Sequence, residues 1–138
     1  MKSLFISLTL RSEKGIVAVE FALFLPLFLM ILFSIIEVGG AWNSKQMMVS
    51  ASREGVRMAS LFNDGNDITE LEVQTYVLNI LQQAGFPGEA SVEANGINGS
   101  AGDLVTVSIE SPYEFPVLTP LLGISPVNLT AATVARQE

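Results

Sequence analysis

The feature that most constrains this chain is an apolar run of 21 residues at positions 16–36. Glu20 is its only charged residue, and Ser34 is its only other polar side chain. As a helix, the run would be about 32 Å long at about 1.5 Å per residue, close to the roughly 30 Å hydrocarbon core of a bilayer. A soluble helix of this length normally has a polar face, and this run has none. The sequence therefore predicts a transmembrane helix.

Charge is distributed unevenly on the two sides of this run. Residues 1–14 carry a net charge of +2, whereas residues 37–138 hold 12 acidic and 4 basic residues, a net charge of −8. Because basic flanks stay on the cytoplasmic side, the pattern predicts a cytoplasmic N-terminus and an exported C-terminal part. An exported part this acidic also argues against nucleic acid as a partner, because it cannot replace the counterions of phosphates.

The chain contains neither cysteine nor histidine. Disulfides and cysteine-bound metals are therefore excluded, and the commonest general base and metal ligand is missing. No carboxylate pair or serine has a spacing typical of a catalytic site, so we expect no enzyme, no cofactor and no metal site. Asp64, Asn66 and Asp67 in the loop "NDGND" leave Ca²⁺ binding open, although their spacing is not that of an EF-hand.

Glu20 requires a partner if it lies inside a membrane, where an isolated charge is costly. Lys14 is the only basic residue within helical reach of it, and we expect Lys14 to lie among the headgroups. Cleavage after Gly15 would create an amine on Ile16, one helical turn before Glu20. That amine could pair with Glu20 of the same chain or of a neighbouring subunit. Alternatively, Glu20 lies near the interface and stays solvated or protonated.

The motif "GIVAVEF" resembles the processing site of class III (type IVb-like) prepilins. That resemblance implies cleavage by a prepilin peptidase, with Gly15 as the last leader residue and Ile16 as the mature N-terminus. Glu20 and Phe21 would be the Glu-Phe pair that sets helix register during assembly. Glycine suits such a site because it places no side chain between the peptide bond and the protease.

The longer segment that contains "EFALFLPLF" and "SASREGVRMAS" resembles TadE-like proteins, the pseudopilins of tight-adherence (Flp) pilus systems. The tail from "VTVSIE" through "TPLLG" to "VARQE" is similar to the same family. The resemblance implies a bacterial inner-membrane protein with a periplasmic C-terminal domain, acting in cell adhesion and biofilm formation. Its implied partners are the prepilin peptidase, the major Flp pilin, other pseudopilins and the inner-membrane assembly platform.

The membrane helix is predicted to continue through residues 37–62. Apolar and small residues recur there at steps of three and four, and predict a buried stripe of Val38, Ala41, Trp42, Val49, Ser52, Val56 and Ala59. Trp42 fits either the membrane interface or the core. Gly39 and Gly40 weaken the helix and suggest a hinge. Arg53, Glu54 and Arg57 form either a docking patch or an ordinary solvated face.

The rest of the chain predicts a small α+β domain with a three- to four-stranded antiparallel sheet. A second helix is expected over residues 68–84, capped by Asp67 with Glu70, with Leu71, Val77, Leu78, Leu81 and Ala84 facing the core. Strands are expected at "ASVEA", "LVTVSIE", "YEFPVL" and "VNLTAATVARQE". Val105, Val107 and Ile109 should be buried in the second strand, and Val127 and Leu129 in the last.

These predictions divide the chain into a leader at 1–15, a membrane helix at 16–36 and an exported domain at 37–138. The leading function is a minor pilin or pseudopilin of a tight-adherence pilus. The alternative is a soluble periplasmic or secreted domain, released by a general signal peptidase near Ala41. A membrane-tethered enzyme is the weakest of the three function classes.

Overall fold

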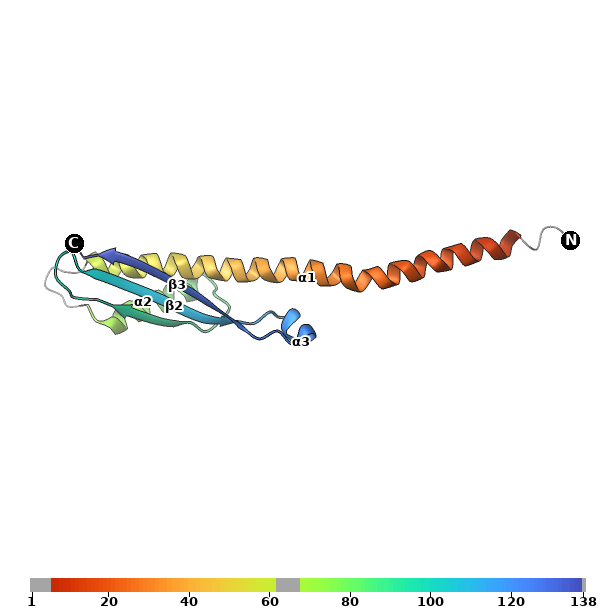
Figure 1. The fold of residues 1–138 in the computed structure, drawn as a ribbon. Coiled ribbons are helices and arrows are strands. Elements are labelled where there is room, and N and C mark those ends of the chain that lie inside the picture. Colours follow the sequence, from red (N-terminus) through yellow and green to blue (C-terminus); the bar gives the residue numbers. More distant parts are fainter. Residues whose placement is uncertain (1–5, 62–67, 138) are drawn as a thin grey trace. The chain divides into compact units, whose positions relative to one another are not determined.

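A computed structural model describes the backbone of residues 6–61 and 68–137 of the 138-residue chain. The elements follow in the order α1 (Ile6–Leu61), α2 (Glu70–Gln83), β1 (Ser91–Asn95), β2 (Leu104–Tyr113), α3 (Leu118–Leu122) and β3 (Val127–Arg136) (Figure 1). This arrangement confirms the predicted α+β class. The chain divides after Glu37 into two compact units, which are described separately below.

The first unit consists of the part of α1 that precedes Val38. Between residues 16 and 36, all valine, leucine, isoleucine and phenylalanine side chains are exposed, from 37% for Phe33 to 74% for Leu23. Pro26 lies inside the helix without ending it. The Ser34 hydroxyl donates a 2.7 Å hydrogen bond to the Met30 carbonyl, so this polar group is satisfied within the helix. Among the described residues, α1 is the only helix long and apolar enough to cross a membrane, as judged by length and composition.

The second unit contains a three-stranded antiparallel sheet with the strand order β1-β2-β3. Val92 pairs with Ile109 and Ala94 with Val107, while Ile109 also pairs with Ala131. The prediction of a strand over "YEFPVL" was wrong, because β2 ends at Tyr113 and the chain then turns through Pro116 into α3. Proline cannot donate to a strand ladder, which explains why the pairing does not continue through residue 116.

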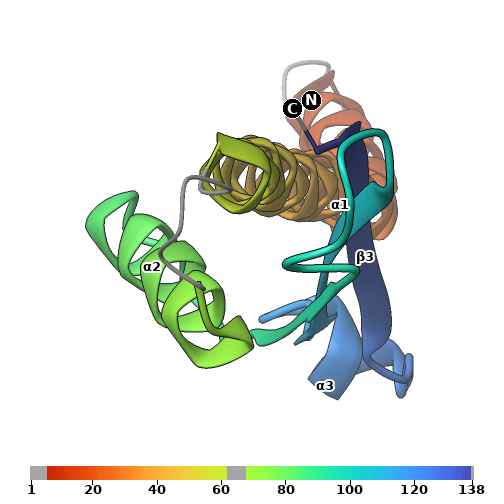
Figure 2. The same ribbon diagram turned by 90° about the vertical axis from the view of Figure 1, so that its left-hand side faces the viewer.

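One face of the sheet packs against α2 and against α1 from Val38 onward (Figure 2). The predicted alternation in β2 is confirmed, since Val105, Val107 and Ile109 are fully buried. In β3 the prediction was partly wrong, because Val127 is 46% exposed and the buried residue is Ala131, at 4% exposure. Leu129 is half-buried against the core. The face of β3 that packs against the core therefore begins at Leu129, two residues after Val127, where the apolar pattern had placed it.

Helix α2 is capped by Thr69, not by Asp67, which lies outside the described residues. The Thr69 hydroxyl accepts a hydrogen bond from the Glu72 backbone amide, and the Glu72 carboxylate accepts one from the Thr69 backbone amide. The predicted end is confirmed: Gly85, at φ 75°, follows the C-cap Ala84 and allows a Schellman turn. The helix therefore starts two residues later than predicted.

The buried face of α2 also differs from the prediction. Val73, Val77 and Leu81 are buried, and Ile80 packs partly against the core. Leu71 is 70% exposed and Leu78 42% exposed, and Ala84 is exposed as well, so these three predicted core residues were wrong. Leu71 and Leu78 lie seven residues apart on one side of the helix, roughly opposite Val73 and Ile80.

In the second unit, α1 presents a buried stripe of small and medium-sized side chains. Its buried residues are Ser44, Met48, Ala51, Ser52, Gly55, Val56, Ala59 and Ser60. Of the predicted stripe, Ser52, Val56 and Ala59 are confirmed, and Ala41 and Val49 are half-buried. Val38 and Trp42 are exposed, at 58% and 67%, so their predicted place in the stripe was wrong.

Candidate functional site

The predicted processing and register residues all lie on the first part of α1. Gly15 is helical, because α1 already begins at Ile6, and nothing lies within 4 Å of the position a Cβ would take there. Ile16 is 57% exposed and Phe21 65% exposed. Glycine lowers helix stability by about 1 kcal/mol relative to alanine, so Gly15 is a weak point in an otherwise strong helix. Because no described atom lies near this position, unwinding the helix here would disturb no packing of Gly15 against the rest of the described structure.

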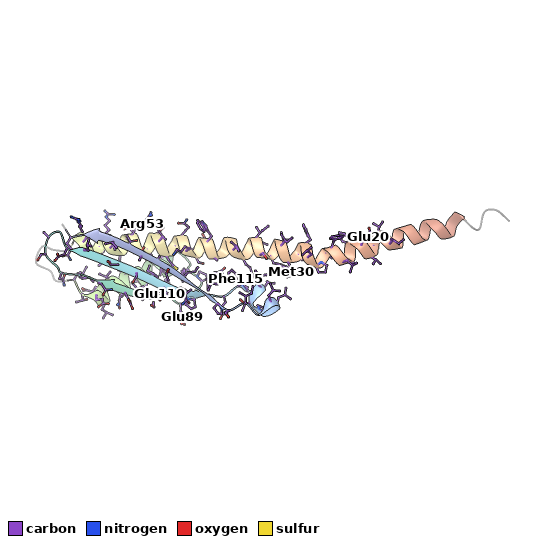
Figure 3. The ribbon with its side chains drawn as sticks, viewed as in Figure 1. Glu20, Met30, Arg53, Glu89, Glu110 and Phe115 are labelled. Carbon is purple, nitrogen blue, oxygen red and sulfur yellow. The ribbon has the colours of Figure 1, made fainter. Side chains whose placement is uncertain are left out.

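Glu20 projects from α1 and is exposed (Figure 3). Within the described ranges it has neither a hydrogen bond nor an ion pair. Its neighbours along the helix, Val19 and Phe21, are exposed apolar side chains. The structure thus presents a carboxylate on an apolar surface, four residues after Ile16, as the sequence indicated. An arrangement of this kind can bind a cation or a positively charged group brought by another molecule.

The predicted charged patch lies on α1 in the second unit, on the side away from the sheet. The side chain of Arg53 points away from the strands in Figure 3. Arg57 and Glu54 form an ion pair with 3.8 Å between Nη1 and Oε2, and their side chains are 72% and 50% exposed. An exposed pair at this distance contributes little to stability. No described acidic group pairs with Arg53, which leaves its guanidinium available to a partner.

The buried residues beside this patch explain why it faces outward. Gly55 sits between the patch residues, and a Cβ there would collide with Val77 Cγ2 of α2 and lie 3.4 Å from Val107 Cγ1 of β2. Glycine at this position lets α1 approach both elements closely. The helix can then bury Gly55 and Val56 while Arg53, Glu54 and Arg57 remain in solvent.

Sequence reasoning missed the polar contact that joins α1 to β3. Ser52 Oγ lies 2.7 Å from Thr133 Oγ1 and also donates a hydrogen bond to the Val49 carbonyl. Ser52 is fully buried, so its hydroxyl needs such partners. The available signal was the recurrence of small residues at steps of three and four, from Ser44 through Ala51 and Gly55 to Ala59. Small residues at that spacing indicate a close approach of backbones.

The second unit also has surface pockets, two of which have volumes of about 470 and 420 Å³. The 420 Å³ pocket lies between the loop at Phe86–Glu89 and the end of β2 near Tyr113. In residues 6–61 and 68–137 no group of three or more carboxylates could hold a metal ion. Asp64, Asn66 and Asp67, for which Ca²⁺ binding was left open, lie outside those ranges.

The fold and these residues define a general class: a small α+β domain carried on one long apolar helix that fits a single-pass membrane anchor. The family model of TadE-like proteins matches residues 15–57, which confirms the resemblance over that segment. All of the predicted site residues, from Gly15 to Arg57, lie within the matched segment, and the C-terminal tail lies outside it. A TadE-like segment suggests a role in tight-adherence pilus systems. No curated protein and no solved structure matches the chain.

Proposed function

We propose that this chain is a minor pilin or pseudopilin subunit, used in the assembly of a tight-adherence (Flp, type IVb-like) pilus. The observation that carries the proposal is Glu20, a carboxylate without a partner in the described structure, on an exposed apolar helix within a TadE-like segment. A helix that only anchored a domain would gain nothing from such a costly group. A helix that must align with others in a bundle would gain a register contact.

In the proposed mechanism, a prepilin peptidase hydrolyses the peptide bond between Gly15 and Ile16 on the cytoplasmic side. Water adds across the bond, so Gly15 ends in a carboxylate and Ile16 begins with an amine. That amine is protonated and donates a hydrogen bond to the carboxylate of Glu20, with which it forms an ion pair. The pair forms either within one chain or between neighbouring subunits. Charge pairing of this kind lowers the cost of keeping the carboxylate in lipid, and apolar contacts from the exposed residues hold the helices together.

The exported domain supplies the second contact in this proposal. We assign Arg53, Glu54 and Arg57 to docking against the major Flp pilin, another pseudopilin or the inner-membrane assembly platform. The support is that Arg53 is exposed and lacks an ion pair among the described acidic groups, beside the weak pair of Arg57 with Glu54. An arginine fork of this kind can bind a carboxylate of a partner in bidentate geometry.

The test of processing is the mass and N-terminal sequence of the protein extracted from membranes, in cells with and without prepilin peptidase. The expected mature chain begins at Ile16 in the presence of the peptidase and retains its leader in the absence of the peptidase. A start at Trp42 would indicate release by a general signal peptidase. An unchanged mass in both strains would contradict processing and, with it, the proposed pilin role.

The test of register is the substitution Glu20→Ala. We expect membrane insertion to be unchanged or improved, because a charge is removed from the span, while pilus assembly falls severalfold. Ser34→Ala is the matched control, because it removes the other polar side chain of the span, which is already satisfied by Met30. Normal piliation by the Glu20 variant would overturn the register role.

The test of docking is Arg53→Glu, which reverses an exposed charge. We expect recovery of the protein with other pilus components to fall severalfold, while the free energy of unfolding changes by no more than about 0.5 kcal/mol. Arg136→Glu makes the same charge change at an exposed position on β3 and should leave recovery unaltered. Equal effects of the two variants would show that only net charge matters.

A further inference from the structure

The segment from Phe115 to Val127, which we call the α3 tip, exposes a cluster of apolar side chains. Leu121 is 59% exposed, Leu122 50%, Ile124 38% and Val127 46%. The sequence contains no charged residue between Glu114 and Arg136, in a part of the chain that is otherwise acidic. Single exposed leucines are ordinary, but a cluster of this kind without charges marks an interaction surface.

The α3 tip is held in this form by its own contacts. Within α3, Leu118 is buried, at 7% exposure. The Phe115 amide donates a 3.1 Å hydrogen bond to Thr119 Oγ1, and the Gly123 amide donates one of 2.9 Å to the Thr119 carbonyl. Gly123 adopts φ 66° and caps the short helix. Leu121 and Leu122 are therefore held outward by a defined turn.

The α3 tip lies at the end of the second unit where the chain enters from the apolar run. Tyr113, at the end of β2, approaches Gly40 of α1 so closely that a Cβ on Gly40 would lie 2.7 Å from its hydroxyl oxygen. Gly40 is two residues after Val38, where this unit begins. Tyr113 also packs edge to face with Phe115 at the start of the tip, with ring centroids 5.3 Å apart. In Figure 1, α3 lies beyond the ends of β2 and β3 at this same end of the sheet.

From these observations we infer that the α3 tip inserts into the boundary between headgroups and acyl chains of the bilayer that α1 spans. The inference rests on the membrane span assumed in the proposed function. The domain then has two attachments to the membrane, α1 and the tip. Together they limit how far it can tilt, and so fix which of its faces meets a neighbouring subunit.

The chemistry of the tip favours lipid over a protein partner. Pro116, Pro120 and Pro126 have no backbone N–H, which reduces the number of donors that must find a partner in an apolar medium. A protein interface normally adds a hydrogen bond for each 100–200 Å² or so, and the exposed side chains of the tip offer few donors. Exposed Trp42, two residues from Gly40, has the side chain that settles most readily at a membrane interface. A shallow depth of about 5–10 Å is expected, because exposed loop backbone is not tolerated deeper.

The absence of cysteine allows a direct test with single-cysteine variants of the full chain, reconstituted in phosphatidylcholine vesicles. Leu121→Cys carries an environment-sensitive fluorophore, and its quenching by lipids brominated on the acyl chain is measured. Leu104→Cys is the matched control, because Leu104 is also a leucine with 59% exposure but lies at the opposite end of β2. Ile31→Cys reports on the span itself, where the side chain is 54% exposed.

We expect the labels at residues 121 and 31 to be quenched severalfold more than the label at residue 104. If the label at residue 31 is quenched but the label at residue 121 is quenched no more than the label at residue 104, the tip does not insert. The membrane anchor would still stand. No quenching at 31 would overturn the anchor and with it the proposed function. The label at residue 121 could instead be protected from aqueous iodide but not quenched by lipid, with protection that increases with protein density. That result would show contact with another copy of the chain and would also overturn the inference.

A second variant separates insertion from folding. The pair Leu121→Asp and Leu122→Asp, combined with a label at Ile124→Cys, should lose most of the lipid quenching seen at Ile124 without the aspartates. Both substitutions are at exposed positions, so the far-UV circular dichroism spectrum should stay the same. Persistent quenching at Ile124 with an unchanged spectrum would contradict insertion through these leucines.

Discussion

At the scale of single residues, Gly55 determines how closely the layers of the α+β domain approach. Its absent side chain leaves room for Val77 of α2 and Val107 of β2, and both valines are fully buried. Any larger residue would push α1 away from the buried residues of the sheet, such as Ile109. Glycine is otherwise unfavourable inside a helix, so its presence here is explained by packing.

Gly55→Ala should therefore destabilise the domain although alanine favours helix. The expected clash costs about 1–3 kcal/mol, because the valine methyl group must move in a close-packed core. Gly39→Ala is the matched control: it lies in the same helix with nothing within 4 Å of the added Cβ, and should gain up to about 1 kcal/mol. Chemical denaturation of the full chain in detergent measures both values. Equal stability of the two variants would show that α1 and α2 do not approach closely at Gly55.

At the scale of elements, α2 shows how a cap and a packing face are chosen independently. Its apolar residues occupy two sides, with Val73, Val77 and Leu81 inward and Leu71 and Leu78 outward. Its start is set by the reciprocal bonds of Thr69 and Glu72, in which the Thr69 backbone amide lies 2.8 Å from Glu72 Oε2. Two hydrogen bonds to the carboxylate, from the amide and then the hydroxyl of Thr69, hold the pKa of Glu72 below its ordinary value.

Thr69→Ala should reduce the free energy of unfolding by about 1 kcal/mol at neutral pH, since it removes the side-chain half of the cap. Folding lowers the pKa of Glu72, so its ionised carboxylate stabilises the folded state. This stabilisation is present above the unfolded carboxyl pKa of about 4.3 and is lost as the pH falls through the pKa of the folded state. The deficit of the variant should therefore shrink in acid. Denaturation curves at several pH values check this.

Thr75→Ala provides the control for the cap. The Thr75 hydroxyl donates to the Leu71 carbonyl inside the same helix, so removing it should be close to neutral at every pH. A deficit of Thr69→Ala that stays constant from neutral pH to acid would show that Glu72 takes no part in the cap.

At the scale of the whole molecule, the chain consists of two units with opposite surface chemistry. The first exposes valine, leucine, isoleucine and phenylalanine side chains along residues 16–36, and the second contains most of the acidic residues. Trp42 follows the division after Glu37 by five residues and is 67% exposed. Such a side chain fits the interface between an apolar and an aqueous medium.

The single tryptophan makes this arrangement measurable without substitution. In vesicles, intrinsic fluorescence of Trp42 should be quenched more by lipids brominated near the headgroup than by lipids brominated near the chain end, because the indole ring settles at headgroup level. Free tryptophan in the same vesicles is the control. Stronger quenching by the lipids brominated near the chain end would show that the membrane span extends beyond Trp42. No quenching by either lipid would show that Trp42 does not contact the membrane.

Several features follow from the sequence by itself. The apolar run at 16–36 has no polar face, because Glu20 and Ser34 are its only polar side chains, and β2 alternates from Val105 to Glu110. Each pattern therefore fits only one kind of element. The end of α2 is equally determined, because Gly85 readily adopts the positive φ that the turn requires. The roles of Gly15, Ile16 and Glu20 are implied by the resemblance of their motif to prepilin processing sites, and they stay a prediction.

Tertiary structure decided what local patterns left ambiguous. In α2 both sides are apolar, so only packing against β1 and α1 selects Val73 over Leu71. In α1 the pattern of the sequence identified Ser52, Val56 and Ala59 of the buried stripe but missed Ser44, Ala51 and Gly55, because small side chains contribute little hydrophobicity. Their burial depends on how closely another backbone approaches α1. That distance is set only when the elements pack together in the core, so it cannot be read from any one segment of the sequence.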